Sequence, residues 1–182
     1  MKKPNKTNKQ TIFAIYAGDK KGLIGQVLVY FNRKSYDVSS LNVARTDISD
    51  LVLITLEATI PENDLKPFTE RLKKIIEVYA ITTYGDGHSL KKAGFYRMAI
   101  PALNNELWQL IGSYGALLSS MGKDTFVISK TGSDQDLQQL YAGLEGPHLL
   151  GFSQTGLISE SRLIDGEEGR VMSEERISRL AA

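Results

Sequence analysis

Side chains able to do chemistry are sparse in this sequence. Cysteine is absent, and the two histidines, His88 and His148, have no Cys, His or Glu partner at the spacing of a metal site. Gly85-Asp86-Gly87 begins like a dinucleotide-binding fingerprint, but Leu90 stands where its third glycine should be. No phosphate-binding loop and no nucleophile with a base is apparent. We therefore predict no catalytic residue, no metal site and no cofactor on this chain.

One loop has the composition of a small binding site. Gly18 to Gly22 leads from an expected strand into an expected helix that begins near Leu23. The free N–H groups and the dipole at a helix start attract a small anion such as a carboxylate, and glycine lets a ligand approach closely. The same residues also suit an ordinary strand-to-helix turn, and the residues alone favour that simpler interpretation.

The composition describes a folded protein with balanced charge. The chain has 182 residues, 42% of them hydrophobic, and its 22 basic and 21 acidic residues nearly cancel. Such a balance lacks the positive patch expected of a protein that binds nucleic acid or anionic lipid. No apolar run approaches the ~20 residues needed to cross a bilayer. We expect a cytoplasmic protein with neither nucleic acid nor membrane as partner.

The first half of the chain predicts a β-α-β-β-α-β unit over residues 11–84, after a solvated tail over residues 1–10. Strands are expected at residues 11–17, 41–43, 51–56 and 78–84. Apolar residues recur at helical spacing from Leu23 to Phe31, which predicts the first helix. A second helix is expected to be capped by Asn63, with Pro67 early enough to break no internal hydrogen bond.

The second half repeats this order. Residues 85–94 are polar and glycine-rich, which predicts a linker between two domains. Over residues 95–160, strands are expected at 95–100, 114–118, 125–129 and 148–154. Ser133 and Asp136 are spaced as a capping box for the second helix of this half. Residues 161–182 form a charged tail.

These elements predict an α+β fold, an α/β sandwich of two tandem ferredoxin-like βαββαβ modules. In each module both helices would cover one face of the sheet, so the other face must be covered by a partner. Modules this small bury little surface on their own, and we therefore expect the chain to associate.

The first module resembles a known family over most of residues 11–84. Its motifs are Asp19-Lys20-Lys21-Gly22-Leu23-Ile24-Gly25-Gln26-Val27, then Phe31, then Tyr36-Asp37-Val38-Ser39-Ser40-Leu41-Asn42-Val43-Ala44-Arg45-Thr46-Asp47. At the same spacing, these motifs are similar to the N-terminal ACT domain of the small regulatory subunits of acetolactate synthase. The second half resembles that family's C-terminal ACT-like domain in element order and length.

The resemblance implies a non-catalytic regulatory subunit in branched-chain amino acid biosynthesis, the route to valine, isoleucine and leucine. Its partner would be the large catalytic subunit, which this chain would activate and which would carry thiamine diphosphate, magnesium and FAD. Paired ACT domains form the effector sites of the family. The resemblance thus also implies a homodimer and a branched-chain amino acid effector, usually valine.

The resemblance also implies which residues would bind an effector. These are Asp19, Gly22, Leu23, Ile24 and Gly25 of one subunit, facing Asp37 and Val38 of its partner. The chain departs from the family because Asp19 and Asp37 replace asparagines, Gly25 replaces serine and Ser35 replaces glycine. Each aspartate repels an effector's carboxylate, so we expect activation to persist while valine binds weakly or not at all.

Two alternatives remain open at this point. One is a free-standing ACT-domain sensor that regulates another enzyme or transcription. The other is an RNA-binding module, since the same topology occurs in that class. RNA-binding modules place aromatic residues on central strands beside basic residues, whereas residues 51–56 are aliphatic apart from one threonine.

Overall fold

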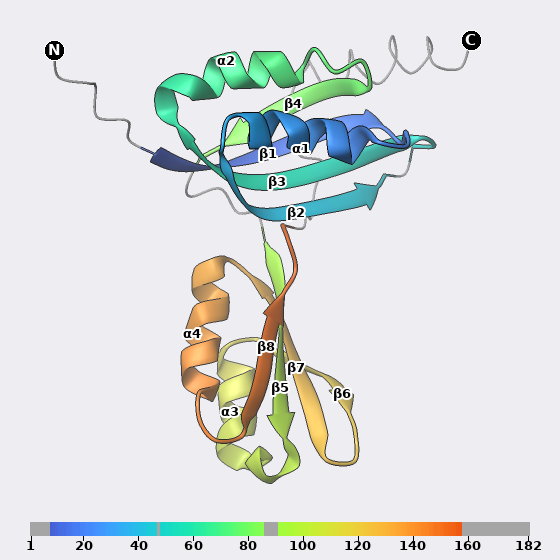
Figure 1. Cartoon of the computed structure of the whole chain (residues 1–182). Helices are drawn as coiled ribbons and strands as arrows, with labels where there is room; N and C mark the ends of the chain where they lie inside the picture. The colour runs from blue at the N-terminus through green and yellow to red at the C-terminus, as the bar shows by residue number, and fades with distance from the viewer. Residues whose placement is uncertain (1–7, 47, 86–90, 158–182) are drawn as a thin grey trace, which may run out of the picture. The chain divides into compact units, whose positions relative to one another are not determined.

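The computed structural model describes residues 8–46, 48–85 and 91–157 of the 182-residue chain (Figure 1). These residues form two compact units, one up to residue 85 and one from residue 91. Each unit has a four-stranded sheet and two α-helices. The predicted fold class, two tandem βαββαβ modules of mixed α and β structure, is confirmed.

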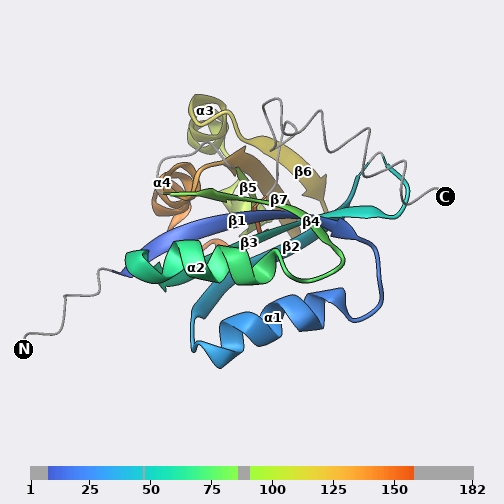
Figure 2. The same cartoon turned by 90° about the horizontal axis from the view of Figure 1, so that it is seen from above.

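The first module has the strand order β2-β3-β1-β4, with every neighbouring pair antiparallel. Both helices cover the same face of this sheet (Figures 1 and 2). The order leaves β2 and β4 at the edges. The elements are β1 (Asn8–Gly18), α1 (Leu23–Arg33), β2 (Asp37–Arg45), β3 (Leu51–Pro61), α2 (Glu62–Leu72) and β4 (Val78–Tyr84).

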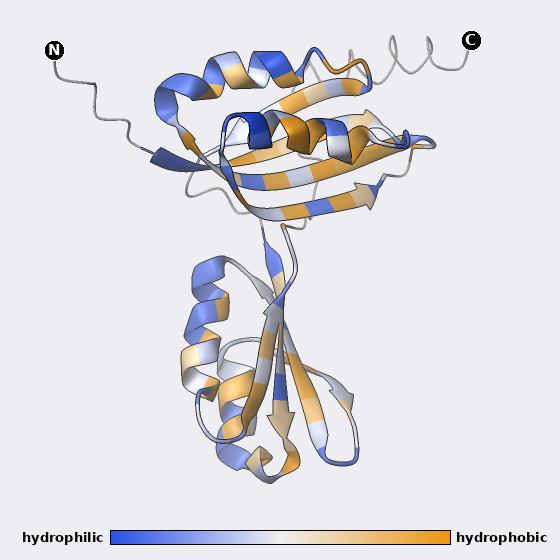
Figure 3. Ribbon diagram, viewed as in Figure 1, coloured by the Kyte–Doolittle hydropathy of each residue, from blue (hydrophilic) through white to orange (hydrophobic). Residues whose placement is uncertain are grey.

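Apolar residues that alternate along β1 and recur at helical spacing along α1 form the core of the first module. Phe13 and Ile15 on β1 are fully buried, and the α1 stripe ends in the equally buried Phe31. The rings of Phe13, Phe31 and Phe68 pack edge to face, with centroids 4.8 to 6.1 Å apart. Figure 3 shows hydrophobic residues on the strands of this module and in the middle of α1.

The second module has the corresponding order β6-β7-β5-β8, again with antiparallel neighbours. Its core centres on Tyr96, which is fully buried and donates a 2.7 Å hydrogen bond to the carbonyl oxygen of Leu137. The elements are β5 (Lys92–Ala99), the short 3-10 helix η1 (Ile100–Ala102), α3 (Asn105–Ser113), β6 (Leu117–Met121), β7 (Thr125–Gly132), α4 (Asp134–Leu144) and β8 (Leu149–Gln154).

Two strands begin earlier than predicted. β1 starts at Asn8, inside the predicted tail, because this strand pairs with β3 as far as Pro61. β5 starts at Lys92, inside the predicted linker, where the Lys92 ammonium lies 2.8 Å from the Asp134 carboxylate. Residues 1–7, the linker residues 86–90 and the predicted tail at 161–182 lie outside the described residues.

The start of α2 also differs from the prediction. Pro61 is its N-cap, so Asn63, the predicted cap, lies within the first turn. Pro67 consequently falls in the helix interior, where its missing N–H removes one helical hydrogen bond. The expectation that Pro67 would break no internal bond is therefore wrong.

Both modules enter their edge strand through the same turn. After α1, Ser35 adopts a left-handed φ of 54°, and the Tyr36 N–H donates to the Phe31 carbonyl oxygen at 3.1 Å. After α3, Gly115 has a φ of 61° and the Ala116 N–H donates to Ile111 at 2.9 Å. This turn delays β6 to Leu117, three residues later than predicted.

The helix-free faces of the two sheets differ. On the second sheet, Phe95 and Leu117 are 37% and 70% exposed on that face, as an uncovered sheet would have them. On the first sheet, Thr55 and Glu57 on that face are only 2% and 3% exposed. No helix in the described segments is long and apolar enough to span a membrane.

Candidate functional site

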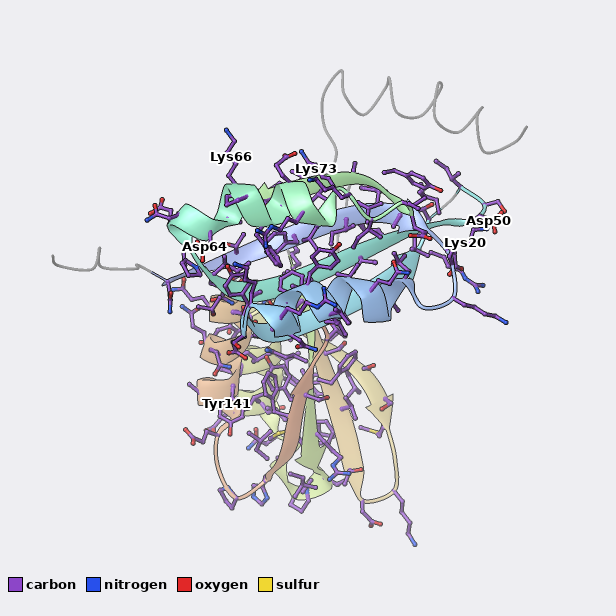
Figure 4. All side chains as sticks on the ribbon, turned by 45° about the horizontal axis from the view of Figure 1, so that its top comes forward. Lys20, Asp50, Asp64, Lys66, Lys73 and Tyr141 are labelled. Atoms are coloured by element: carbon purple, nitrogen blue, oxygen red, sulfur yellow. The ribbon has the colours of Figure 1, made fainter. Side chains whose placement is uncertain are left out.

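The predicted loop after β1 lies at one end of the first module, the end where Figure 4 labels Lys20 and Asp50. The Asp19 N–H donates to the Asp50 carbonyl oxygen at 2.8 Å, which fixes the loop to the start of β3. One Asp19 carboxylate oxygen, Oδ2, lies 3.6 Å from Arg45 Nε. Because both side chains are largely exposed, this ion pair contributes at most about 1 kcal/mol.

The helix start beside this loop is open to solvent. Gly22 is the N-cap of α1, has a φ of 86°, and supplies no side-chain cap. Ile24 is 40% exposed, and a Cβ added at Gly25 would meet no atom within 4 Å. Leu23 is 3% exposed and belongs to the core, so its side chain cannot line a surface site. Free N–H groups here favour a carboxylate.

The other two predicted residues lie at the opposite end of the sheet. Asp37 begins β2 opposite Thr59, whereas Gly18, just before the loop, pairs with Leu51. Eight residues of strand separate those two rows, which is roughly 27 Å at 3.4 Å per residue. Asp37 is exposed and Val38 packs partly against the core. Within one chain the seven predicted residues therefore form two separate groups.

A cavity of about 280 Å³ lies next to the second group. Across it, the Tyr36 hydroxyl donates a 3.0 Å hydrogen bond to Asp64 Oδ2. Burial, followed by this hydrogen bond and the charge of Asp64, raises the pKa of Tyr36 to about 12, so its hydroxyl stays a donor. The lining residues are Asn8, Lys34, Ser35, Tyr36, Thr59, Pro61 and Asp64.

A smaller cavity of about 150 Å³ lies on the same module, between the start of β1, α2 and the end of β4. None of the seven predicted residues lines either cavity. The smaller cavity is lined by Lys9, Thr11, Glu62, Leu65, Thr83, Tyr84 and Gly85.

Sequence reasoning missed Arg45 beside Asp19 and the pairing of Tyr36 with Asp64. The two residues of that pair are 28 positions apart, so no local spacing brings them to attention. In the described parts of the chain, no group of three His, Asp or Glu side chains is placed to hold a metal ion.

Comparison with known proteins gives a consistent result. No family model matches the chain. It is 24% identical over 151 residues to the acetolactate synthase small subunit of Mycolicibacterium smegmatis, covering 82% of this chain and 89% of that protein. The Bacillus subtilis acetolactate synthase small subunit is 21% identical over 170 residues, 92% of this chain and 97% of that protein.

A solved structure shares the whole fold. The acetolactate synthase small subunit from Thermotoga maritima superposes with a TM-score of 0.74 at 14% identity, covering 86% of this chain and 99% of that one. The resemblance read from the motifs of the first module is therefore confirmed: the chain is a homologue of acetolactate synthase small subunits and has their two-module ACT-type fold.

Proposed function

We propose that this chain is the regulatory subunit of an acetolactate synthase, which binds the large catalytic subunit and raises its activity in branched-chain amino acid biosynthesis. The observation that carries the proposal is the extent of the likeness to small subunits, which reaches 92% of this chain and 97% of the Bacillus subtilis protein. A match of that extent includes both modules, not one ACT domain alone. Thiamine diphosphate, magnesium and FAD then belong to the large subunit.

The proposal includes a homodimer formed through the first modules. β2 is an edge strand, and Leu41 and Val43 on it are 36% and 39% exposed. Exposed apolar side chains on an edge strand favour pairing with another strand. A strand that pairs with its own copy about a two-fold axis perpendicular to the sheet runs antiparallel to it. Asp37 of one copy then approaches the end of β2 that carries Arg45 in the other, and unlike charges meet.

Pairing also explains how two distant groups of residues serve one site. The loop at Asp19 and the start of β2 at Asp37 lie at opposite ends of one sheet. Antiparallel pairing of two sheets brings the loop end of one copy beside the Asp37 end of the other. An amino acid bound there would meet N–H donors at the start of α1, carboxylate acceptors, and the apolar side chains of Ile24 and Val38.

We expect valine to bind weakly at this composite site. Asp19 and Asp37 accept hydrogen bonds from an ammonium group but repel a carboxylate. Arg45 offsets only part of this repulsion, because the exposed pair that it makes with Asp19 is weak. The chain would then activate its partner with little feedback inhibition.

Co-expression with an acetolactate synthase large subunit from the same organism tests the proposal. We expect a tagged chain to retain the large subunit through purification and to increase the turnover of pyruvate, with little change on adding valine. The large subunit alone, at the same concentration, is the control. Absence of both a complex and a rate increase would refute the function, and strong inhibition by valine would refute only the weak effector response.

A further inference from the structure

The larger cavity of the first module has the character of a binding site that is separate from the predicted effector residues. It lies where the turn after α1, the start of β1, the end of β3 and the first turn of α2 meet. All of its walls come from one module, so its existence does not depend on a second copy of the chain. Its volume of about 280 Å³ is at the small end for ligand sites and suits a metabolite of amino acid size.

Two opposite charges line this cavity. Lys34 is the C-cap residue of α1, and Asp64 lies in the first turn of α2. A cation at a helix C-terminus and an anion at a helix N-terminus are each favourably placed with respect to the helix dipole. A ligand with separate negative and positive ends would satisfy this pair.

The carboxylate of Asp64 is held in a defined position. The Tyr36 hydroxyl donates to it at 3.0 Å, and the Tyr36 ring packs edge to face on Phe68 with centroids 5.0 Å apart. Phe68 is itself only 3% exposed. An acceptor positioned in this way loses little freedom when it binds an ammonium group.

The rest of the lining is mainly polar. Ser35 and Thr59 contribute hydroxyl groups and Asn8 an amide, whereas the apolar lining is limited to Pro61 and the Tyr36 ring. Asn8 and Ser35 are exposed and Thr59 is partly buried, so water occupies this polar wall when no ligand is bound. A hydroxyl or amide on the ligand replaces the hydrogen bonds of the displaced water, whereas a methyl group of the same size does not.

We propose that this cavity binds a small polar α-amino acid, with the carboxylate at Lys34, the ammonium at Asp64, and the polar side chain among Ser35, Thr59 and Asn8. The ligand differs in class from the branched-chain effector of the composite site. The site also needs neither the large subunit nor pairing through β2.

Calorimetric titration of the full chain with L-threonine and L-valine tests the ligand class, since the two differ only by a hydroxyl in place of a methyl group. We expect saturable binding of L-threonine with a dissociation constant below about 1 mM, and binding of L-valine at least about tenfold weaker. L-Threoninamide, which lacks the carboxylate, and 3-hydroxybutyrate, which lacks the ammonium, should each bind at least about tenfold more weakly than L-threonine.

Paired variants locate the site. Lys34→Met and Asp64→Asn should each weaken L-threonine binding at least about tenfold, because each removes one charge while keeping the side chain's shape. Lys66→Met and Asp50→Asn make the same chemical changes at labelled residues outside the cavity and should leave binding unchanged (Figure 4). Circular dichroism of all four variants shows whether the fold is retained.

Three results would overturn the proposal. These are no saturable heat up to about 10 mM L-threonine, equal affinity for L-valine, and equal losses in the cavity variants and their controls. None of them bears on activation of the large subunit, which the co-expression experiment measures separately.

Discussion

Ser35 adopts a backbone conformation that favours glycine, although it carries a side chain. Its φ of 54° lies in the left-handed region, where a Cβ clashes with the backbone at a cost of roughly 1 kcal/mol. The second module has Gly115 at the corresponding turn, with nearly the same φ of 61°. In the family that the first module resembles, the residue at this position is glycine. Serine here therefore lowers the stability of the fold, and the hydrogen bonds of the turn hold Ser35 in its strained conformation.

Replacing Ser35 with glycine should stabilise the first module. We expect Ser35→Gly to raise the free energy of unfolding by up to about 1 kcal/mol, because glycine adopts this φ without strain. Urea titration followed by circular dichroism measures the change.

The reverse substitution is the control for this argument. Gly115→Ser should lower the free energy of unfolding of the second module by about 1 kcal/mol. The fluorescence of Trp108, the single tryptophan of the chain, follows the unfolding of that module. Destabilisation by Ser35→Gly would show that the serine side chain contributes more than its strained backbone costs.

At the scale of a single element, α4 has the best-defined start among the described helices. Ser133 Oγ accepts a hydrogen bond from the Asp136 N–H at 3.2 Å, and Asp136 Oδ2 accepts from the Ser133 N–H at 2.8 Å. The Ser133 N–H, followed by its hydroxyl, holds the pKa of Asp136 below the ordinary value of 3.8. The predicted capping box is thus confirmed.

This cap makes the stability of the second module depend on pH in acid. Because the folded pKa of Asp136 is lowered, the ionised cap stabilises α4 fully above pH 3.8 and loses its effect as the pH falls through the folded pKa. Ser133→Ala should lower the free energy of unfolding of the second module by about 1 kcal/mol at pH 7. The stability difference between the wild type and Asp136→Asn should shrink as the pH is lowered into this range, as urea titrations followed by Trp108 fluorescence would show.

Glu106→Gln on α3 is the matched control. Glu106 also lies in a first turn, but the cap of α3 is the neutral side chain of Asn104, which accepts from the Leu107 N–H at 2.8 Å. Glu106→Gln should lower the free energy of unfolding at pH 7 by much less than Asp136→Asn does. An equal loss would mean that the helix dipole, and not the capping box, explains the effect at Asp136.

At the scale of the whole molecule, the outer edge of β2 is the surface that association would cover. Besides Leu41 and Val43 on the strand, Ile24 and Val29 on α1 are 40% and 42% exposed. Small modules with apolar edges gain stability by pairing, and that gain depends on protein concentration.

A charge placed at the centre of this edge should separate the two copies. In a two-fold pair each substitution acts twice, so Leu41→Lys brings two like charges together and removes two apolar contacts. We expect the dimer dissociation constant to rise at least about tenfold, since Leu41 is 36% exposed and burying that part of two leucines is worth roughly 1 to 2 kcal/mol. Sedimentation equilibrium measures the constant.

Leu117→Lys supplies the control, because Leu117 lies on β6, the corresponding edge strand of the second module. It should leave the dissociation constant unchanged. A larger effect of Leu117→Lys than of Leu41→Lys would mean that the second modules, and not the first, form the pair.

The sequence by itself determined the two modules, their element order and the family likeness, because alternation, helical spacing and the motif from Asp19 to Thr46 are local patterns. The predicted starts of strands were wrong where pairing with a residue distant in the sequence sets them. β1 reaches back to Asn8 because β3 is long enough to pair with it, and β5 begins at Lys92, whose ammonium pairs with Asp134.

Only the tertiary structure decided how the candidate residues are distributed. Spacing along the chain could not show that the loop at Asp19 and the start of β2 lie at opposite ends of one sheet, because α1 and the turns on either side of it carry the chain back to the other end of the strands. It also could not show that Tyr36 meets Asp64 across a cavity, since that contact joins the turn between α1 and β2 to the first turn of α2. Local patterns in the sequence predict helices and strands. Contacts between residues far apart in the chain form only when the sheet and helices pack.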